Sequence, residues 1–216
     1  MIYLALEFST ERRSVAVLDS GRPADAVGEA GAPADGALEL VERVLARARV
    51  EREQVGCLVV GRGPGSYAGI RSAIALAQGW QLATGVPLLG VSSVEGLAAE
   101  ATAAGLTGRG NVVLDAQRGE LYLAGYDLGA GAWREGAPLR LASMAEARAR
   151  AEAGEPMLGP EVTRWFPTGR TMWPSALTLA RLAAGRTDFI PGAALEPIYL
   201  RAVEFVKAPP PRVVPA

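Results

Sequence analysis

The sequence contains no histidine, one cysteine and one lysine. Without histidine, a chain cannot build a Ser-His-Asp triad, a Cys-His pair, an imidazole general base or a zinc site with histidine ligands. A lone cysteine cannot form an intrachain disulfide or a multi-cysteine metal site, and the position of Cys57 in an apolar run predicts a buried, unreactive thiol. Lysine Schiff-base chemistry is limited to Lys207. We therefore expect no metal and no cofactor.

Excess charge and long apolar runs are also missing. The 216 residues carry a net charge of -1, so the chain lacks the basic excess typical of proteins that grip a nucleic acid backbone. It has no apolar run of 18 or more residues that would predict a membrane span. Its N-terminus has neither the basic segment nor the cleavage site of a signal peptide. These features predict a cytoplasmic, globular α/β protein.

The first half of the sequence alternates apolar runs with helical patterns. Continuous apolar runs such as 55–61 predict strands covered on both faces, and the apolar stripe after Asp35 predicts a helix that this residue caps. The order β-β-β-α-β-α-β-α is typical of a mixed sheet with helices on both faces. The predicted strands are 2–8, 14–18, 24–29, 55–61 and 87–91, and the predicted helices are 34–49, 68–84 and 93–104.

The second half repeats this order loosely, with strands first and helices after them. We predict strands at 111–114, 120–126, 138–141 and 156–159, and helices at 145–153 and 174–184. The expected division is an N-terminal lobe over 1–104, a smaller C-terminal lobe over 105–206 and a proline-rich tail over 207–216.

A glycine-rich segment, Gly61–Arg71, is the most unusual stretch of the chain. The spacing of Gly63, Gly65 and Ala68 matches a dinucleotide-binding loop between a strand and a helix. Pro64 removes one amide donor from such a loop. The favoured interpretation is a tight turn, in which the glycines let a helix pack close to a sheet.

Two further turns carry polar residues at places where actin-like ATPases bind metal and phosphate. Glu7, Ser9 and Thr10 follow the first strand, and Asp115 begins a turn at the start of the second lobe. Close approach of phosphate to backbone needs small residues, and the second turn contains a bulky Arg118. For Asp115 and Glu120, turn capping and surface solvation are favoured over an acid–base pair.

Five segments together resemble one known family. They comprise an opening strand-turn-strand, the glycine-rich segment, a following strand and helix, the turn that begins the second lobe and a short closing motif. In order they are 4–17, 61–71, 90–98, 115–122 and 197–201. This ordered set resembles the TsaB/YeaZ family, non-catalytic subunits in the bacterial synthesis of threonylcarbamoyladenosine in tRNA.

The resemblance implies an actin-like (ASKHA, RNase H-like) two-lobed fold and a scaffold rather than an enzyme. The implied partners are a TsaD-like catalytic paralogue, a TsaE-like ATPase and, through the complex, tRNA, with a homodimer forming in isolation. The paralogue binds metal through a His-x-x-x-His pair on its first long helix, and the corresponding helix here, 34–49, has no histidine. The sequence departs from the family pattern at Glu7, where aspartate is usual, and at 33–36, where a His-Ser pair is common.

The resemblance also implies that the two helices of the first lobe form a four-helix bundle with the partner. The apolar residues predicted to contact the partner are Leu38, Val41, Leu45, Ile70, Ala73, Ile74, Ala77 and Trp80. The alternative for each of them is a place in the core of the lobe. Two other functions stay open from the sequence: an actin-like nucleotide-binding enzyme that uses Glu7, Ser9, Thr10 and Asp115, and a dinucleotide-binding enzyme that uses Gly63 and Gly65.

Overall fold

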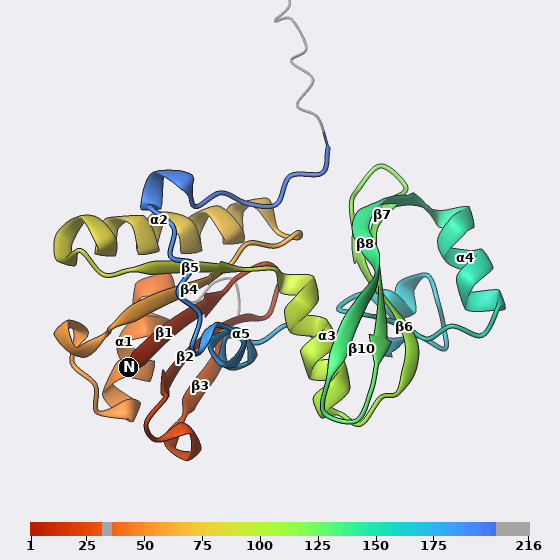
Figure 1. Cartoon of the computed structure of the whole chain (residues 1–216). Coiled ribbons are helices and arrows are strands. Elements are labelled where there is room, and N and C mark those ends of the chain that lie inside the picture. The colour runs from red at the N-terminus through yellow and green to blue at the C-terminus, as the bar shows by residue number, and fades with distance from the viewer. Residues whose placement is uncertain (32–35, 202–216) are drawn as a thin grey trace, which may run out of the picture.

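A computed structural model of the chain describes residues 1–31 and 36–201, and its framework is two five-stranded mixed sheets (Figure 1). Sheet A has the strand order β3-β2-β1-β4-β5, and sheet B has the order β10-β9-β6-β7-β8. In sheet A, β1 pairs antiparallel with β2 and parallel with β4. The strands of sheet A are β1 (Ile2–Glu7), β2 (Arg13–Asp19), β3 (Val27–Gly31), β4 (Cys57–Gly61) and β5 (Leu88–Val91).

Sheet B combines an antiparallel meander with two short parallel strands. Its β7 pairs antiparallel with β6 and β8, and β9 runs parallel to β6 and β10. The strands are β6 (Gly108–Asp115), β7 (Glu120–Leu128), β8 (Trp133–Ser143), β9 (Met157–Gly159) and β10 (Arg170–Thr171). The helices of the chain are α1 (Ala37–Ala48), α2 (Tyr67–Thr84), α3 (Ser93–Ala103), α4 (Met144–Glu152) and α5 (Ala176–Ala183).

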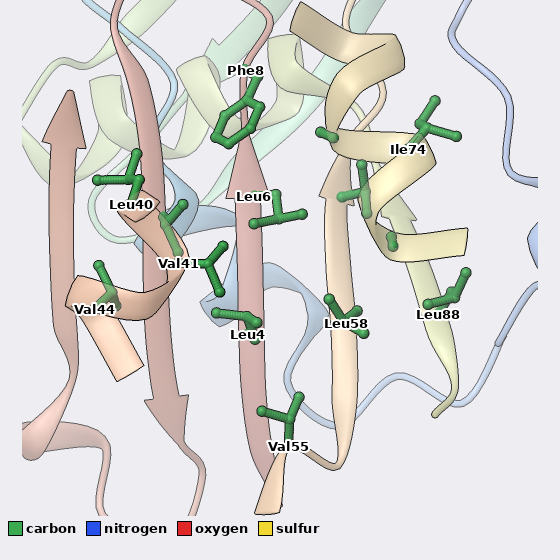
Figure 2. Packing of buried hydrophobic residues seen from close by; sticks show 14 of the residues in the cluster. Leu4, Leu6, Phe8, Leu40, Val41, Val44, Val55, Leu58, Ile74 and Leu88 are labelled. Atoms are coloured by element: carbon green, nitrogen blue, oxygen red, sulfur yellow. The ribbon is translucent and has the colours of Figure 1, made fainter. Parts of the chain in front are cut away.

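Helices cover both faces of sheet A, because alternate side chains of a strand point to opposite faces. Leu4 and Leu6 of β1 lie in the core that α1 and α2 close, together with Leu40 and Ile74 (Figure 2). The neighbouring side chains of the same strand, such as Ala5, lie in the opposite core against α5. All five residues of β4 are buried, as its continuous apolar run predicts.

Helix α3 lies between the two sheets in Figure 1, where it packs on sheet B and on α5, the helix that covers one face of sheet A. Its Val94 and Leu97 belong to a core with Val112 and Tyr126 of sheet B. On the other face of sheet B, Ala147 of α4 packs with Val113 and neighbouring residues. The predicted α/β fold with the order β-β-β-α-β-α-β-α in the first half is confirmed.

Several predicted boundaries differ from the observed ones. The third strand is Val27–Gly31 rather than 24–29, and β8 spans Trp133–Ser143 rather than 138–141. The apolar signal of β8 is weak because most of its side chains are partly or fully exposed. The predicted helix cap, Asp35, and the predicted tail, 207–216, lie outside the described residues.

The chain returns to sheet A after completing sheet B. Helix α5, within the predicted second lobe, packs on β1 and β2, and the amide of Ala176 donates to Ser14 Oγ at 2.9 Å. The segment after α5 then follows the edge of the sheet, where the amide of Ile190 donates to the carbonyl of Leu88 at 3.0 Å. The lobe boundary at residue 104 stays a prediction. None of the helices described here is long and apolar enough to cross a membrane.

Candidate functional site

The glycine-rich segment packs its backbone directly against the turn that follows β1. The amide of Ser66 donates to the carbonyl of Ser9 at 2.7 Å. A Cβ atom on Gly65 would lie 2.1 Å from the carbonyl oxygen of Ser9, and one on Gly69 would lie 2.1 Å from that of Phe8. Neither position has space for a side chain, so the interpretation as a tight turn that lets α2 approach the sheet is confirmed.

Two amide donors of this loop are used inside the protein. Besides the amide of Ser66, the amide of Gly63 donates to Ser93 Oγ at 3.1 Å, and Pro64 has no amide hydrogen. A phosphate-binding loop needs several free amides that point to one place. These contacts favour a structural role for Gly63 and Gly65 over dinucleotide binding.

Glu7, predicted as part of a nucleotide-binding turn, is completely buried. Its Oε1 accepts a hydrogen bond from the amide of Ser9 at 2.6 Å, and its Oε2 accepts one from Ser93 Oγ at 2.6 Å. Burial raises the pKa of the Glu7 carboxyl, against the lowering effect of these hydrogen bonds. The carboxyl therefore joins the end of β1 to the start of α3 instead of facing a cleft.

A cleft of about 540 Å³ lies where the turns after β1 and β6 face one another. It brings together four residues that the sequence singled out, namely Ser9, Thr10, Gly65 and Asp115. Neither Glu7 nor Gly63 lines it. Ser9 Oγ is buried and has no hydrogen-bond partner among the described residues.

The charge of this cleft is unsuited to phosphate. Glu11, Asp115 and Glu161 all line it, with Arg13 as the only basic lining residue. Burial raises the pKa of Glu161, and the nearby carboxylates of Asp115 and Glu11 raise it further. Within residues 1–31 and 36–201, no group of acidic or cysteine side chains has the arrangement of a metal site.

Asp115 caps its own turn, as predicted, because its Oδ1 accepts from the amide of Gln117 at 2.7 Å. Glu120 has a role that the sequence did not suggest. Arg201 donates to Glu120 Oε2 at 2.6 Å and to the carbonyl of Ala116 at 3.1 Å, so the closing motif binds the first turn of sheet B. These residues are more than 80 positions apart in the chain, and no local pattern connects them.

Most of the residues predicted to contact a partner fill the core instead. Their side chains lie between the helices and sheet A, where Val41 and Ile74 are seen in Figure 2. The buried ones are Val41, Leu45, Ile70, Ala73, Ile74 and Ala77. This corrects their assignment as surface residues: the stripe that faces the sheet is the one with the strongest apolar periodicity. Leu38 is 51% exposed and Trp80 is partly exposed, so a contact role for these two stays a prediction.

The outward side of α2 is a second surface of interest. We call it the α2 outer face; it consists of Ala68, Ser72, Ala75, Leu76, Gly79, Trp80, Leu82 and Ala83, which are exposed or partly exposed. Leu76 and Trp80 lie at its border, because each also packs partly against the core. Arg71 is the only charged residue in the 18-residue helix, and Leu82 is 88% exposed. A surface helix normally carries charged residues on its solvent side. An uncharged side of this length is typical of a contact surface.

Comparison with known proteins places the chain among tRNA-modification proteins. Residues 34–171 match the family described as "TsaD: tRNA N6-adenosine threonylcarbamoyltransferase". The chain is 29% identical over 183 residues to the Escherichia coli tRNA threonylcarbamoyladenosine biosynthesis protein TsaB, covering 76% of this chain and 78% of that protein. It is 33% identical over 125 residues to the protein of the same name from Haemophilus influenzae, covering 56% and 52%.

The fold is also shared with a solved structure. YeaZ from Pseudomonas aeruginosa superimposes with a TM-score of 0.79 at 28% identity, over 92% of this chain and 99% of that chain. A second Pseudomonas aeruginosa structure, described as an uncharacterized protein similar to peptidase YeaZ, gives the same TM-score and identity. The two-lobed actin-like fold expected from the resemblance is confirmed.

Proposed function

The chain belongs to the tRNA N6-adenosine threonylcarbamoyltransferase family, in its TsaB/YeaZ group, and on this premise we propose that it is a non-catalytic scaffold subunit in the synthesis of threonylcarbamoyladenosine in tRNA. It would bind a TsaD-like catalytic paralogue and hold it in an active form. A TsaE-like ATPase and tRNA would join through that complex. Without the paralogue, the same surface would pair two copies of this chain.

The observation that carries this proposal is the α2 outer face. Trp80 and Leu82 offer apolar area there, and Ala75 and Gly79 are small enough for a second helix to approach closely. Burying the α2 outer face would desolvate none of its own side-chain charges, because the only charged residue of the helix, Arg71, is not part of that face. Leu38 of α1 is exposed on the same layer of the fold and would extend the contact.

The non-catalytic part of the proposal is supported by the residues that could do chemistry. The whole sequence has no histidine, so the metal ligands expected of the catalytic paralogue have no counterpart on α1. Cys57 is completely buried, and burial raises the pKa of its thiol to about 11, which is unfavourable for a nucleophile. The acidic lining of the cleft repels nucleotide phosphates.

The interface is tested with one substitution in the α2 outer face and a matched control. Ala75→Glu places a charge on an exposed position of α2, and Ala149→Glu does the same on α4, which packs on sheet B. We expect Ala75→Glu to weaken retention of the catalytic paralogue in a pull-down by at least about tenfold, because removing a charge from water is costly. Ala149→Glu should bind as the unsubstituted chain does. Equal retention of both variants would contradict the interface.

The function as a whole is tested by complementation. Expressed in a bacterial strain that lacks its own TsaB, the unsubstituted chain should restore threonylcarbamoyladenosine, measured by mass spectrometry of digested tRNA. Calorimetry with Mg-ATP tests the enzyme alternative on the isolated chain. Micromolar binding with turnover would overturn the scaffold proposal.

A further inference from the structure

A second pocket, of about 320 Å³, lies on a different side of the junction between the two sheets. It is formed by the turn before β2, the end of β3, helix α3 and the segment that connects β10 to α5. Its volume is at the lower end of the range for small-molecule sites, roughly 300–1,000 Å³. The lining residues that matter for binding are Arg12, Glu100, Arg170, Trp173 and Ser175.

Two arginines at this pocket have no carboxylate partner among residues 1–31 and 36–201. In the described part of the chain, 11 of the 20 basic residues form ion pairs, including Arg164 with Asp115 beside the acidic cleft. Arg12 and Arg170 are exposed and form none. Two guanidinium groups lining one pocket raise its positive potential, so a bound anion would relieve their mutual repulsion.

Trp173 adds an aromatic wall to the same pocket. The Arg12 guanidinium lies over its ring, with its Cζ 5.6 Å from the ring centre. The indole Nε1 is buried and has no acceptor in the described part of the chain. The ring of Trp173, rather than this N–H, is therefore what the side chain offers to a ligand.

Glu100 is the one acidic residue of the lining, and its carboxylate is already engaged. Its Oε1 accepts hydrogen bonds from Ser175 Oγ and Thr178 Oγ1 at the start of α5. The helix dipole at that end also favours a negative charge. Glu100 therefore reduces the positive potential of the pocket without pairing either arginine.

We propose that this pocket binds a phosphate group, carried by a free nucleotide or by an RNA strand. A phosphate monoester carries a charge of about -1.5 to -2 at neutral pH, which matches two guanidinium groups. Arginine forks bind phosphate oxygens with two parallel hydrogen bonds, and an aromatic ring beside them suits a stacked base. The neighbouring cleft, lined by three carboxylates, offers no such match.

The site is tested by calorimetry on the full chain with AMP, inorganic phosphate and succinate as probes, at low salt. The double variant Arg12→Ala/Arg170→Ala should weaken AMP binding by about tenfold or more, because charge-assisted hydrogen bonds are among the strongest in proteins. The matched control is Arg148→Ala/Arg181→Ala, which removes the same charge from exposed arginines outside the pocket. The control should bind AMP within about twofold of the unsubstituted chain.

Two further variants test individual walls of the pocket. Glu100→Gln removes the negative charge from the lining and should tighten AMP binding. If AMP does not bind in this pocket, its affinity should be unchanged by the substitution. Trp173→Ala removes the aromatic wall and should weaken AMP binding several-fold, because a stacked base would lose its platform. Thermal unfolding of each variant confirms that it is folded.

The source of the phosphate is identified with a labelled single-stranded RNA. If RNA binds, the Arg12→Ala/Arg170→Ala variant should lower the slope of log K against log salt by roughly 1.4, since each lost contact on a single strand accounts for about 0.7. If only AMP and inorganic phosphate bind, the ligand is a free nucleotide. The proposal is overturned if no probe binds, if both double variants lose the same affinity, or if succinate binds as well as phosphate. Complementation by the unsubstituted chain is a separate measurement, so failure of this site does not count against the proposed function.

Discussion

Replacing Gly69 by alanine should destabilise the protein, although alanine is the better helix former. Gly69 lies in the first turn of α2, and its Cβ would be 2.1 Å from the carbonyl oxygen of Phe8. Real Cβ atoms essentially never approach another atom more closely than 3.0 Å, so the helix and the turn must separate by about 0.9 Å. Both colliding groups are anchored to backbone, and neither can rotate away.

The size of the effect follows from two opposing contributions. Overpacking of a tight interior costs about 1–3 kcal/mol, and the upper end applies here because backbone must move. Alanine regains about 1 kcal/mol of helix propensity over glycine. The net loss in free energy of unfolding is therefore about 2 kcal/mol, or a fall in Tm of about 4–8 °C for a chain of this size.

Gly79 is the matched control, because it lies in the same helix and a Cβ there would contact nothing within 4 Å. Gly79→Ala should gain about 1 kcal/mol and raise Tm by about 2–4 °C. The assay is thermal unfolding followed by circular dichroism on both variants and the unsubstituted chain. If Gly69→Ala is as stable as Gly79→Ala, the close approach of α2 to the turn does not exclude a side chain at residue 69, which refutes the prediction.

Three more predictions concern buried polar groups. Because burial raises the pKa of Glu7, the folded state holds the proton of this carboxyl to higher pH than the unfolded state does. The protonated carboxyl therefore stabilises the fold below about pH 4.5, and this contribution falls as pH rises through the folded pKa. Chemical denaturation at several pH values should show this fall for the unsubstituted chain but not for Glu7→Gln, and the same pH dependence in both proteins would contradict the prediction. The thiol of Cys57 should not react with iodoacetamide at pH 8 until the protein is unfolded, and rapid labelling of the native chain would show that the thiol is accessible. Asn111→Ala should cost about 1–3 kcal/mol in chemical denaturation, because buried Asn111 accepts from Arg150 at 2.8 Å and its loss leaves that donor unpaired. The exposed Arg109→Ala should cost less than about 1 kcal/mol, and equal costs would contradict the role of the buried network.

The elements of the fold were predictable because their signals are local. Strand β4 is a short apolar run flanked by turn residues, and α2 begins where the glycine-rich segment ends. The first eight elements have the predicted order. Boundaries were missed where the local signal is weak, as in β8, whose side chains are mostly in contact with solvent.

The side of a helix that serves as a contact surface was not predictable from periodicity. The apolar stripe of α2 identifies what faces the sheet, and Ala73 and Ala77 lie in that core. The opposite side is notable for lacking charge rather than for being strongly apolar. Composition showed that lack, but only the packing of α2 on sheet A showed which residues it leaves outside.

The absence of histidine and the order of strands and helices are properties that the sequence determined by itself. Each depends on composition or on neighbours within a few residues. Only the tertiary structure decided that Glu7 is buried and accepts a hydrogen bond from Ser93, and that Ser14 accepts one from the amide of Ala176. Likewise, only the tertiary structure decided that Arg12 and Arg170 line one pocket. These residues lie between 86 and 162 positions apart, and the contact of Ser14 with Ala176 depends on the return of α5 to sheet A. Burial, charge and reactivity depend on those distant contacts, and the same contacts form an acidic cleft and a second pocket with two arginines on one chain.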